Sequence, residues 1–299
     1  MRSMKEAPIG RSERNRLSRR DFLRTAAVGA GAGLAGLDRL AAAAPQAAGP
    51  KKKIPVGVQL YSVRQAASKD LPAVVEAIGK MGYKGVEFAG YYGWDSKPKE
   101  LRKLLEGNGL KCCGTHTDLE TVLGDNLKAT AELHAILGNS LLIVPSLEAK
   151  DAQGWLDLAK RFNEIADKAK ALGMRVGYHA HAGDFRKLGD TTSWEIFFDN
   201  TGPDVIMQND IGNCMSGGGD PVAILKKYPG RSASVHLKEF GGPEAAVIGQ
   251  GVVPWAEVFQ VCETTGGTAW YIVEHEVGDD PMGSIKGCLD GLRKMGRGL

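Results

Sequence analysis

Eight short apolar runs alternate with helix-like segments from residue 54 to the end of the chain, and this alternation limits the fold more than any other feature. The runs are too short for helices and are rich in β-favouring residues, so each predicts a strand. They are Ile54–Tyr61, Gly85–Phe88, Lys111–His116, Leu141–Pro145, Arg175–His181, Val205–Asp210, Ala233–Lys238 and Tyr271–Glu274. The segments with helical spacing of apolar residues are Leu71–Met81, Lys97–Gly107, Leu119–Leu137, Ala152–Leu172, Trp194–Phe198, Pro221–Tyr228, Pro254–Thr264 and Ile285–Met295.

Eight strand-helix units over about 245 residues match the length of a (β/α)8 barrel, typically about 250 residues. The rival α/β fold is an open, doubly wound sheet, which normally carries a glycine-rich phosphate loop after its first strand. Here that place holds Gln59-Leu-Tyr-Ser-Val-Arg64 instead. We therefore predict an α/β fold, a single (β/α)8 TIM barrel over residues 54–299, without a second domain.

The first 44 residues predict an export signal rather than part of the fold. Ser18-Arg-Arg-Asp-Phe-Leu-Arg24 matches the twin-arginine pattern, and an Ala/Gly-rich, weakly apolar segment follows at residues 25–40. We expect a twin-arginine signal peptide at 1–44, a linker at 45–53, contact with the twin-arginine translocase during export and a periplasmic location. The alternative is a basic tail beside a low-complexity Ala/Gly run. No later segment reaches the ~18 apolar residues of a membrane span, so none is expected after signal removal.

Charge and cysteine content exclude two classes of protein. Nine of the 38 Lys/Arg and four of the 35 Asp/Glu lie in the first 44 residues, so the net charge of +3 becomes slightly negative without them. No basic surface for nucleic acid is expected. The five cysteines show no CxxC spacing, which argues against a structural zinc site or a disulfide framework.

Several predicted strands end in residues that bind metals. Glu274 ends an apolar run, and a buried carboxylate is costly unless a cation meets it. His179, Asp210 and His236 end earlier runs, with His181 two residues after His179. A TIM barrel gathers these strand ends at one mouth. Their mixed nitrogen and oxygen atoms suit one divalent Mn, Co, Fe, Zn or Mg ion, and whether His179 or His181 is the ligand stays open.

Each of these residues also has a purely structural interpretation. Asp210 by itself could be a turn residue and Glu274 a salt-bridged rim carboxylate. Lys238 beside a metal could hold a developing oxyanion, or it could form a rim ion pair. Trp255 could line the pocket or only pack, and His134 is expected on a helix surface.

The sequence from about Ile54 to the end resembles the sugar phosphate isomerase/epimerase family, the xylose isomerase-like TIM barrels, and in particular its exported members. The resemblance rests on Gly57-Val-Gln-Leu-Tyr-Ser-Val-Arg64, Gly85-Val-Glu-Phe88, Gly114-Thr-His116, Tyr178-His-Ala-His181, Asp210-Ile-Gly-Asn213 with Gly219-Asp-Pro221, His236-Leu-Lys-Glu239, Gly249-Gln-Gly251 and Glu274. It implies one divalent metal held by Glu, Asp, His and Glu, and a proton moved next to a carbonyl.

By motif match, the Asp, the His and the last Glu of that set are Asp210, His236 and Glu274, while the first Glu position falls on His179. This departure puts a symmetric exchange between two carboxylates in doubt. The Tyr-His-x-His pattern is similar to the inosose dehydratase branch and to enzymes that eliminate across a 3-keto sugar. A histidine, His179 or His181, would then serve as ligand or base.

The resemblance implies a metal-dependent isomerase or epimerase acting on a sugar or keto sugar. The expected catalytic residues are Glu274, His179, His181 and Lys238, the metal ligands His179, Asp210, His236 and Glu274, and the substrate-binding residues Gln59, Tyr61, Glu87, His116, Asn213 and Trp255. The first alternative is a metal-dependent lyase, a dehydratase or 3-keto-glycoside eliminating enzyme.

Two further alternatives stay open. One is a non-catalytic periplasmic sugar-binding barrel. The other is a phosphodiester-cleaving relative, which needs more ligands and a more basic rim than the sequence offers. The sequence leaves the oligomeric state open, a homo-oligomer included. The expected partner is a small-molecule carbohydrate, and the sequence shows no phosphate cradle that would favour a phosphorylated one.

Overall fold

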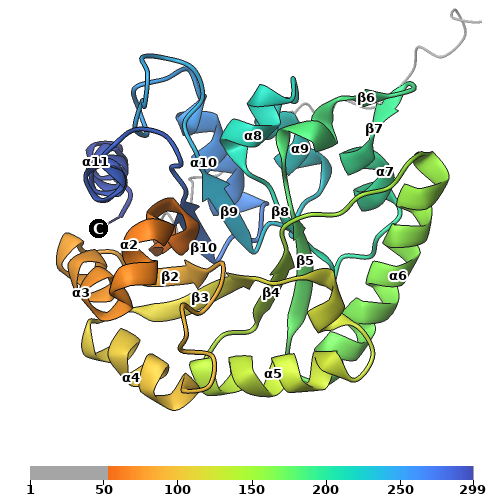
Figure 1. Cartoon of the computed structure of the whole chain (residues 1–299). Coiled ribbons are helices and arrows are strands. Elements are labelled where there is room, and N and C mark those ends of the chain that lie inside the picture. Colours follow the sequence, from red (N-terminus) through yellow and green to blue (C-terminus); the bar gives the residue numbers. More distant parts are fainter. Residues whose placement is uncertain (1–52, 299) are drawn as a thin grey trace, which may run out of the picture. The chain divides into compact units, whose positions relative to one another are not determined.

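The computed structural model describes residues 53–298, which belong to one compact unit. The predicted signal at 1–44 and nearly all of the predicted linker lie outside the described residues. Within the described part, a nearly closed ring of eight parallel strands is surrounded by helices (Figure 1). The predicted TIM barrel is therefore confirmed.

The eight strands of the ring lie in the order β8-β5-β4-β3-β2-β1-β10-β9. They are β1 (Val56–Gln59), β2 (Gly85–Phe88), β3 (Lys111–His116), β4 (Leu141–Val144), β5 (Arg175–His179), β8 (Ile206–Gln208), β9 (Ser234–Leu237) and β10 (Trp270–Val273). The edges of β8 and β9 meet through a parallel bridge between Asp210 and His236. The amide of His236 also donates to the carbonyl of Asn209 at 3.0 Å. We call this junction the β8/β9 seam.

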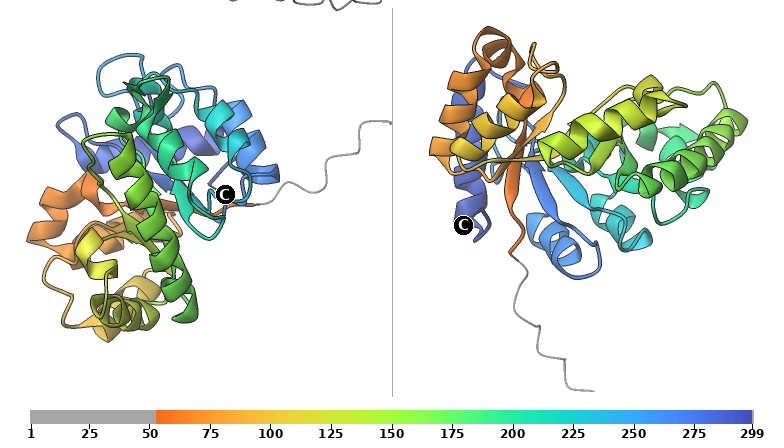
Figure 2. Two further views of the ribbon diagram at one scale, coloured as in Figure 1. Left: turned by 90° about the vertical axis from the view of Figure 1, so that its right-hand side faces the viewer. Right: turned by 90° about the horizontal axis from the view of Figure 1, so that it is seen from below.

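The helices pack around the outside of the ring (Figure 2). They are α2 (Arg64–Lys69), α3 (Leu71–Met81), α4 (Pro98–Gly107), α5 (Asn126–Leu137), α6 (Ala152–Ala171), α7 (Ser193–Asp199), α8 (Ile211–Ser216), α9 (Pro221–Lys227), α10 (Trp255–Thr264) and α11 (Pro281–Lys294). Three 3-10 turns, η1 (Leu60–Val63), η2 (Leu119–Val122) and η3 (Ala182–Phe185), and a hairpin of β6 (Lys187–Leu188) and β7 (Thr191–Thr192), lie in the connections.

Local chemistry explains where the helices begin and end. The carboxylate of Asp70 accepts a hydrogen bond from the amide of Ala73 at 3.0 Å, which satisfies an orphan donor at the start of α3. Gly82 then ends α3 with a φ of 101°, a left-handed conformation that glycine adopts without strain. The predicted helix 119–137 is split into η2 and α5, with Gly124 between them at a φ of 51°. The last helix starts at Pro281, four residues before its first buried apolar residue, because proline favours the first helical turn.

Side chains on the strands alternate between the helix layer and the barrel interior. The outward ones join a large core with the helices, whereas Leu141, Ile143, Ile206 and Ala233 form a separate small apolar cluster. Further along the strands, toward their carboxyl ends, buried positions become polar. All five cysteines are buried and unpaired. Within residues 53–298, no helix is long and apolar enough to cross a membrane.

Candidate active site

Four buried residues at the carboxyl ends of four neighbouring strands bring ligand atoms together inside the barrel mouth. His179 ends β5, Asp210 follows β8, His236 lies in β9 and Glu274 follows β10. One ligand atom of each lies within 4.8 Å of those of the other three. The predicted set of four is therefore assembled in one place.

The distances within this group suit a divalent cation. His236 Nδ1 lies 3.0 Å from Glu274 Oε2 and 3.8 Å from Asp210 Oδ2, and His179 Nε2 lies 4.0 Å from Glu274 Oε2. Bonds of about 2.0–2.2 Å place opposite ligands of one ion about 4 Å apart. Asp210 Oδ2 is buried and has no hydrogen-bond partner among the described residues, while Oδ1 accepts from the amide of Asn213. A buried carboxylate oxygen aimed into such a group is well explained as a metal ligand.

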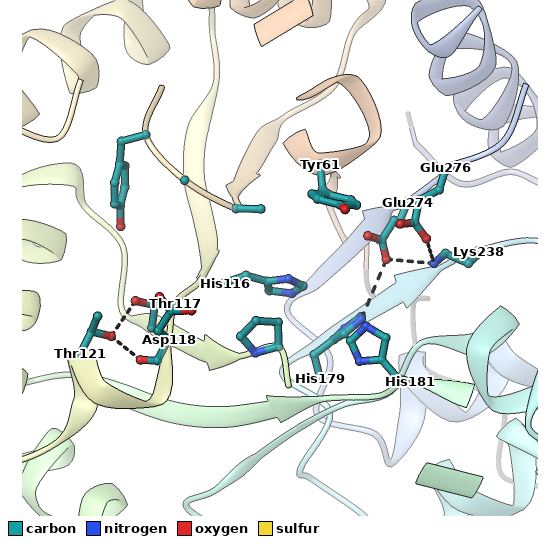
Figure 3. A pocket seen from close by; sticks show the side chains of 14 residues that line it. Tyr61, His116, Thr117, Asp118, Thr121, His179, His181, Lys238, Glu274 and Glu276 are labelled. Atoms are coloured by element: carbon teal, nitrogen blue, oxygen red, sulfur yellow. Dashed lines mark hydrogen bonds and ion pairs between the residues drawn. The ribbon is translucent and has the colours of Figure 1, made fainter. Parts of the chain in front are cut away.

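The structure distinguishes between the two histidines of the Tyr-His-x-His pattern. His179 belongs to the group of four, whereas His181 does not. The ring of His181 lies 5.0 Å from that of His179, edge to face, and lines the same cavity (Figure 3). The geometry therefore favours His179 as ligand and leaves His181 available to a substrate.

Glu87 fixes the orientation of His236. Its Oε2 lies 2.6 Å from His236 Nε2, on the side of the ring opposite Glu274. The carboxylate also accepts from the amides of Gln59 and Gln208 at 2.9 and 2.8 Å. With Nε2–H donated to Glu87, the ring presents Nδ1 to the group of four, as in carboxylate-histidine-metal arrangements.

Gln208 fixes two further histidines. Its amide nitrogen donates to Glu87 and to the hydroxyl of Ser234, so both donors are used. Its Oε1 lies 3.0 Å from His179 Nδ1 and 2.8 Å from His116 Nε2 and can only accept. Each imidazole must therefore donate to it, which leaves His179 Nε2 with a lone pair toward Glu274.

The electrostatics of the group reflect burial and opposite charges. Burial would raise the pKa of Glu274, but His236, Lys238 and His179 hold it well below its usual range. Burial raises the pKa of Asp210 to about 6. Burial would lower the pKa of His236, but Glu87 and Glu274 raise it to about 10, whereas burial, His236 and His116 lower the pKa of His179. A cation bound here would take the place of protons in this group.

A cavity of about 520 Å³ opens above the group. Figure 3 shows Glu274, Lys238 and Glu276 at one end, Thr117, Asp118 and Thr121 at the other, and His116 between them. Lys238 forms an ion pair with Glu276, and its Nζ lies 3.4 Å from Glu274 Oε2 and 3.6 Å from Asp210 Oδ2. Burial would lower the pKa of Lys238, but Asp210, Glu274 and Glu276 raise it, so the ammonium is charged.

The residues predicted to bind substrate fall into two groups. Tyr61 and His116 line the cavity. Gln59 and Glu87 are fully buried. Gln59 donates to Glu87, which in turn holds His236, so the structure gives Glu87 no direct path to a sugar hydroxyl. Asn213 accepts a 3.4 Å hydrogen bond from Lys238. Trp255 is buried, donates its indole N–H to Glu239 and does not line the cavity, because that bond holds it against the β9–α10 loop.

The residue-based prediction did not assign roles to Gln208, Glu276 or Asp118. A signal for Gln208 exists in the sequence, because it precedes Asp210 by two positions and so shares its face of the strand. Glu276 stands in the same relation to Glu274. Asp118 lies in a loop and carries no periodicity that could mark it.

An eight-stranded α/β barrel with a histidine and carboxylate group at the carboxyl ends of its strands defines a TIM barrel with a candidate metal-dependent active site. The sequence model of the xylose isomerase-like TIM barrel family matches residues 75–295. The chain therefore belongs to the xylose isomerase-like TIM barrel family.

Known relatives carry the names of two kinds of enzyme. The chain is 26% identical to an inosose dehydratase of Lacticaseibacillus casei, over 67% of this chain and 81% of that protein. It is 27% identical to an inosose dehydratase of Serratia proteamaculans, over 68% and 81%. A solved sugar phosphate isomerase/epimerase of Parabacteroides distasonis superposes with a TM-score of 0.70 at 26% identity, covering 81% of this chain and 98% of that chain. An L-ribulose 3-epimerase, with a TM-score of 0.58 and 15% identity over 81% and 97%, shares the fold.

Proposed function

We propose that the protein is a divalent-metal-dependent enzyme that removes a proton next to the carbonyl of a keto sugar or keto polyol. The observation that carries this proposal is the buried group of His179, Asp210, His236 and Glu274, in which Oδ2 of Asp210 accepts no hydrogen bond from the described residues, at the floor of an open cavity. A divalent cation held there would act as a Lewis acid on a substrate carbonyl.

The remaining groups of the cavity suit proton transfer. Burial lowers the pKa of His181, so its imidazole is neutral near pH 7 and can accept a proton. The ionised carboxylate of Glu274 lines the same cavity and is a second proton acceptor. The ammonium of Lys238, held by Glu276, stabilises negative charge on a substrate oxygen.

The outcome that the geometry favours after proton removal is elimination of a β-substituent, a lyase reaction. Three imidazoles, of His116, His179 and His181, line the cavity together with the carboxylate of Glu274, whereas the carboxylate of Glu276 is ion-paired with Lys238. The neutral imidazole of His181 can take the α-proton and then donate the same proton to the departing β-substituent, which balances the elimination. The inosose dehydratase names of the relatives support the same outcome.

Isomerisation or epimerisation is the second candidate. The Parabacteroides distasonis sugar phosphate isomerase/epimerase, with a TM-score of 0.70, supports it. In that case Glu274 and His181 would exchange the proton between the two faces of the substrate. A non-catalytic sugar-binding barrel would not need four buried ligand residues gathered at the floor of its cavity.

The first test is the metal content of protein purified without chelator, compared between wild type, Glu274→Gln and the control Glu244→Gln, which alters an exposed loop carboxylate. We expect about one equivalent of a divalent metal in wild type and control and a large loss in Glu274→Gln. NMR on 3-keto-glycosides and ketoses separates the two outcomes, because it detects both proton exchange with deuterated water and release of a β-substituent. A wild type that holds no metal, even after it is added, contradicts the proposal.

A further inference from the structure

We propose that the far end of the cavity, formed by Tyr91, Thr117, Asp118 and Thr121, is a subsite for a second, neutral sugar unit, so that the substrate is a glycoside rather than a sugar phosphate. The proposal rests on the proposed function, since it takes the other end of the cavity as the reacting end. The name "far subsite" is used below for these four residues.

The cavity has room for more than one sugar ring. Its volume of about 520 Å³ lies in the range of pockets that enclose drug-sized ligands, about 300–1,000 Å³, and a single hexose is much smaller than such ligands. The group of four and Lys238 occupy one end, and the far subsite lies at the other, beyond His116 (Figure 3). A sugar held at the metal end would leave the far subsite to whatever is attached to that sugar.

The polar atoms of the far subsite accept hydrogen bonds. The Thr121 hydroxyl donates to the carbonyl of Asp118 at 2.7 Å, so it must accept from the Thr117 hydroxyl, 2.7 Å away. Thr117 Oγ1 thus keeps its lone pairs for a ligand. The Asp118 carboxylate does not cap η2 and is exposed. Acceptors of this kind recognise the hydroxyl groups of a sugar.

Tyr91 supplies an apolar wall to the far subsite. His134 Nδ1 accepts from Asn139, so Nε2 carries the proton and donates to the Tyr91 hydroxyl at 2.7 Å. That hydroxyl lies 3.3 Å from Thr115 Oγ1, inside the protein. With its polar end held there, Tyr91 presents ring surface to the cavity, which suits the C–H face of a sugar ring.

The charges of the cavity disfavour a phosphate. Lys238 is the single Lys or Arg among the described residues that line the cavity, and Glu276, Glu274 and Asp210 already surround it. At the far subsite a phosphate would meet the Asp118 carboxylate with no cation to offset the repulsion.

The test measures binding of unreactive sugars to the full-length protein by calorimetry, with glucose, the β-linked disaccharide cellobiose, the α-linked disaccharide maltose and glucose 6-phosphate as probes. We expect at least one disaccharide to bind tenfold or more tightly than glucose, and glucose 6-phosphate to bind no more tightly than glucose. Asp118→Asn and Tyr91→Ala should each remove most of the advantage of the disaccharide. Glu120→Gln, which removes a charge from the same turn outside the cavity, should not.

The proposal would be overturned if glucose and both disaccharides bound equally, or if the disaccharide advantage survived both variants. It would also be overturned if glucose 6-phosphate bound more tightly than glucose. None of these measurements needs turnover or a keto group. A protein that lacks metal or proton exchange but keeps the Asp118-dependent preference would contradict the proposed function while leaving the far subsite intact. A protein that holds metal and exchanges the proton, but shows no Asp118-dependent preference for a disaccharide, would contradict the far subsite alone.

Discussion

Glu87 lies beneath the candidate metal site and does not itself line the cavity, yet it holds His236 through a 2.6 Å contact. Replacing Glu87 by Gln removes the charge that orients this imidazole. We expect Glu87→Gln to weaken metal binding by about 10- to 100-fold, as is typical when the partner of a metal-binding histidine is lost. Chelator competition measures the affinity, and Glu100→Gln, in the exposed face of α4, serves as control. Unchanged affinity in Glu87→Gln would contradict this role.

His134 differs from its expected position. The sequence predicts it on a helix surface, but the side chain is fully buried between Tyr91 and Asn139. The apolar spacing of α5 does not reveal this, because histidine counts as polar in the pattern. Its two hydrogen-bond partners make burial of the neutral imidazole acceptable.

Burial lowers the pKa of His134 from 6.5 to about 4, and this links its protonation to stability. The unfolded chain binds the proton more tightly, so the contribution is fully present above pH 6.5 and is lost as the pH falls toward 4. At about 1.4 kcal/mol per pKa unit, the loss is about 3 kcal/mol. Urea unfolding of wild type and His134→Gln between pH 4 and 7 measures it. We expect a flatter pH dependence in the variant, and parallel curves would refute the assignment.

Substitutions at two helix glycines can test how closely α11 packs against the loop before α10, with Gly291 at that contact and Gly107 away from it. A Cβ on Gly291 would overlap the backbone carbonyl of Ile248, whereas a Cβ on Gly107 in α4 would meet nothing within 4 Å. We expect Gly291→Ala to destabilise the protein by about 1–3 kcal/mol through overpacking. Gly107→Ala should stabilise it by about 0.5–1 kcal/mol through helix propensity. Thermal unfolding compares the two, and a stable Gly291→Ala protein would show that α11 can shift.

The strands and helices could be predicted far better than the layer beneath the site. Each element depends on its own periodicity and caps, as Asp70 and Gly82 illustrate for α3. The 3-10 turns and the β6–β7 hairpin carry too few residues for a period. Glu87 and His236 are 149 positions apart in the sequence, so their contact becomes visible only once the barrel is assembled. That the four residues His179, Asp210, His236 and Glu274 lie together was predictable because the strand ends of a barrel converge.

The predicted twin-arginine signal lies outside the described residues, and we propose that the protein is exported by that route. A double variant, Arg19→Lys with Arg20→Lys, should keep the protein in the cytoplasm, since the arginine pair is the feature that identifies such signals. Cell fractionation measures the location, and Arg14→Lys with Arg16→Lys is the matched control. Periplasmic protein from the first double variant would disprove this route.

The β8/β9 seam links closure of the barrel to metal binding. Asp210 and His236 form the bridge that joins the two ends of the sheet, and the same two residues belong to the metal-binding group. An ion bound there would link β8 to β9, the two ends of the strand order. Because such an ion would bind only the folded form, it would shift the folding equilibrium toward that form. Metal binding would then complete the active site and stabilise the closed barrel at the same time. A molecule whose β8/β9 seam is open would therefore also be inactive.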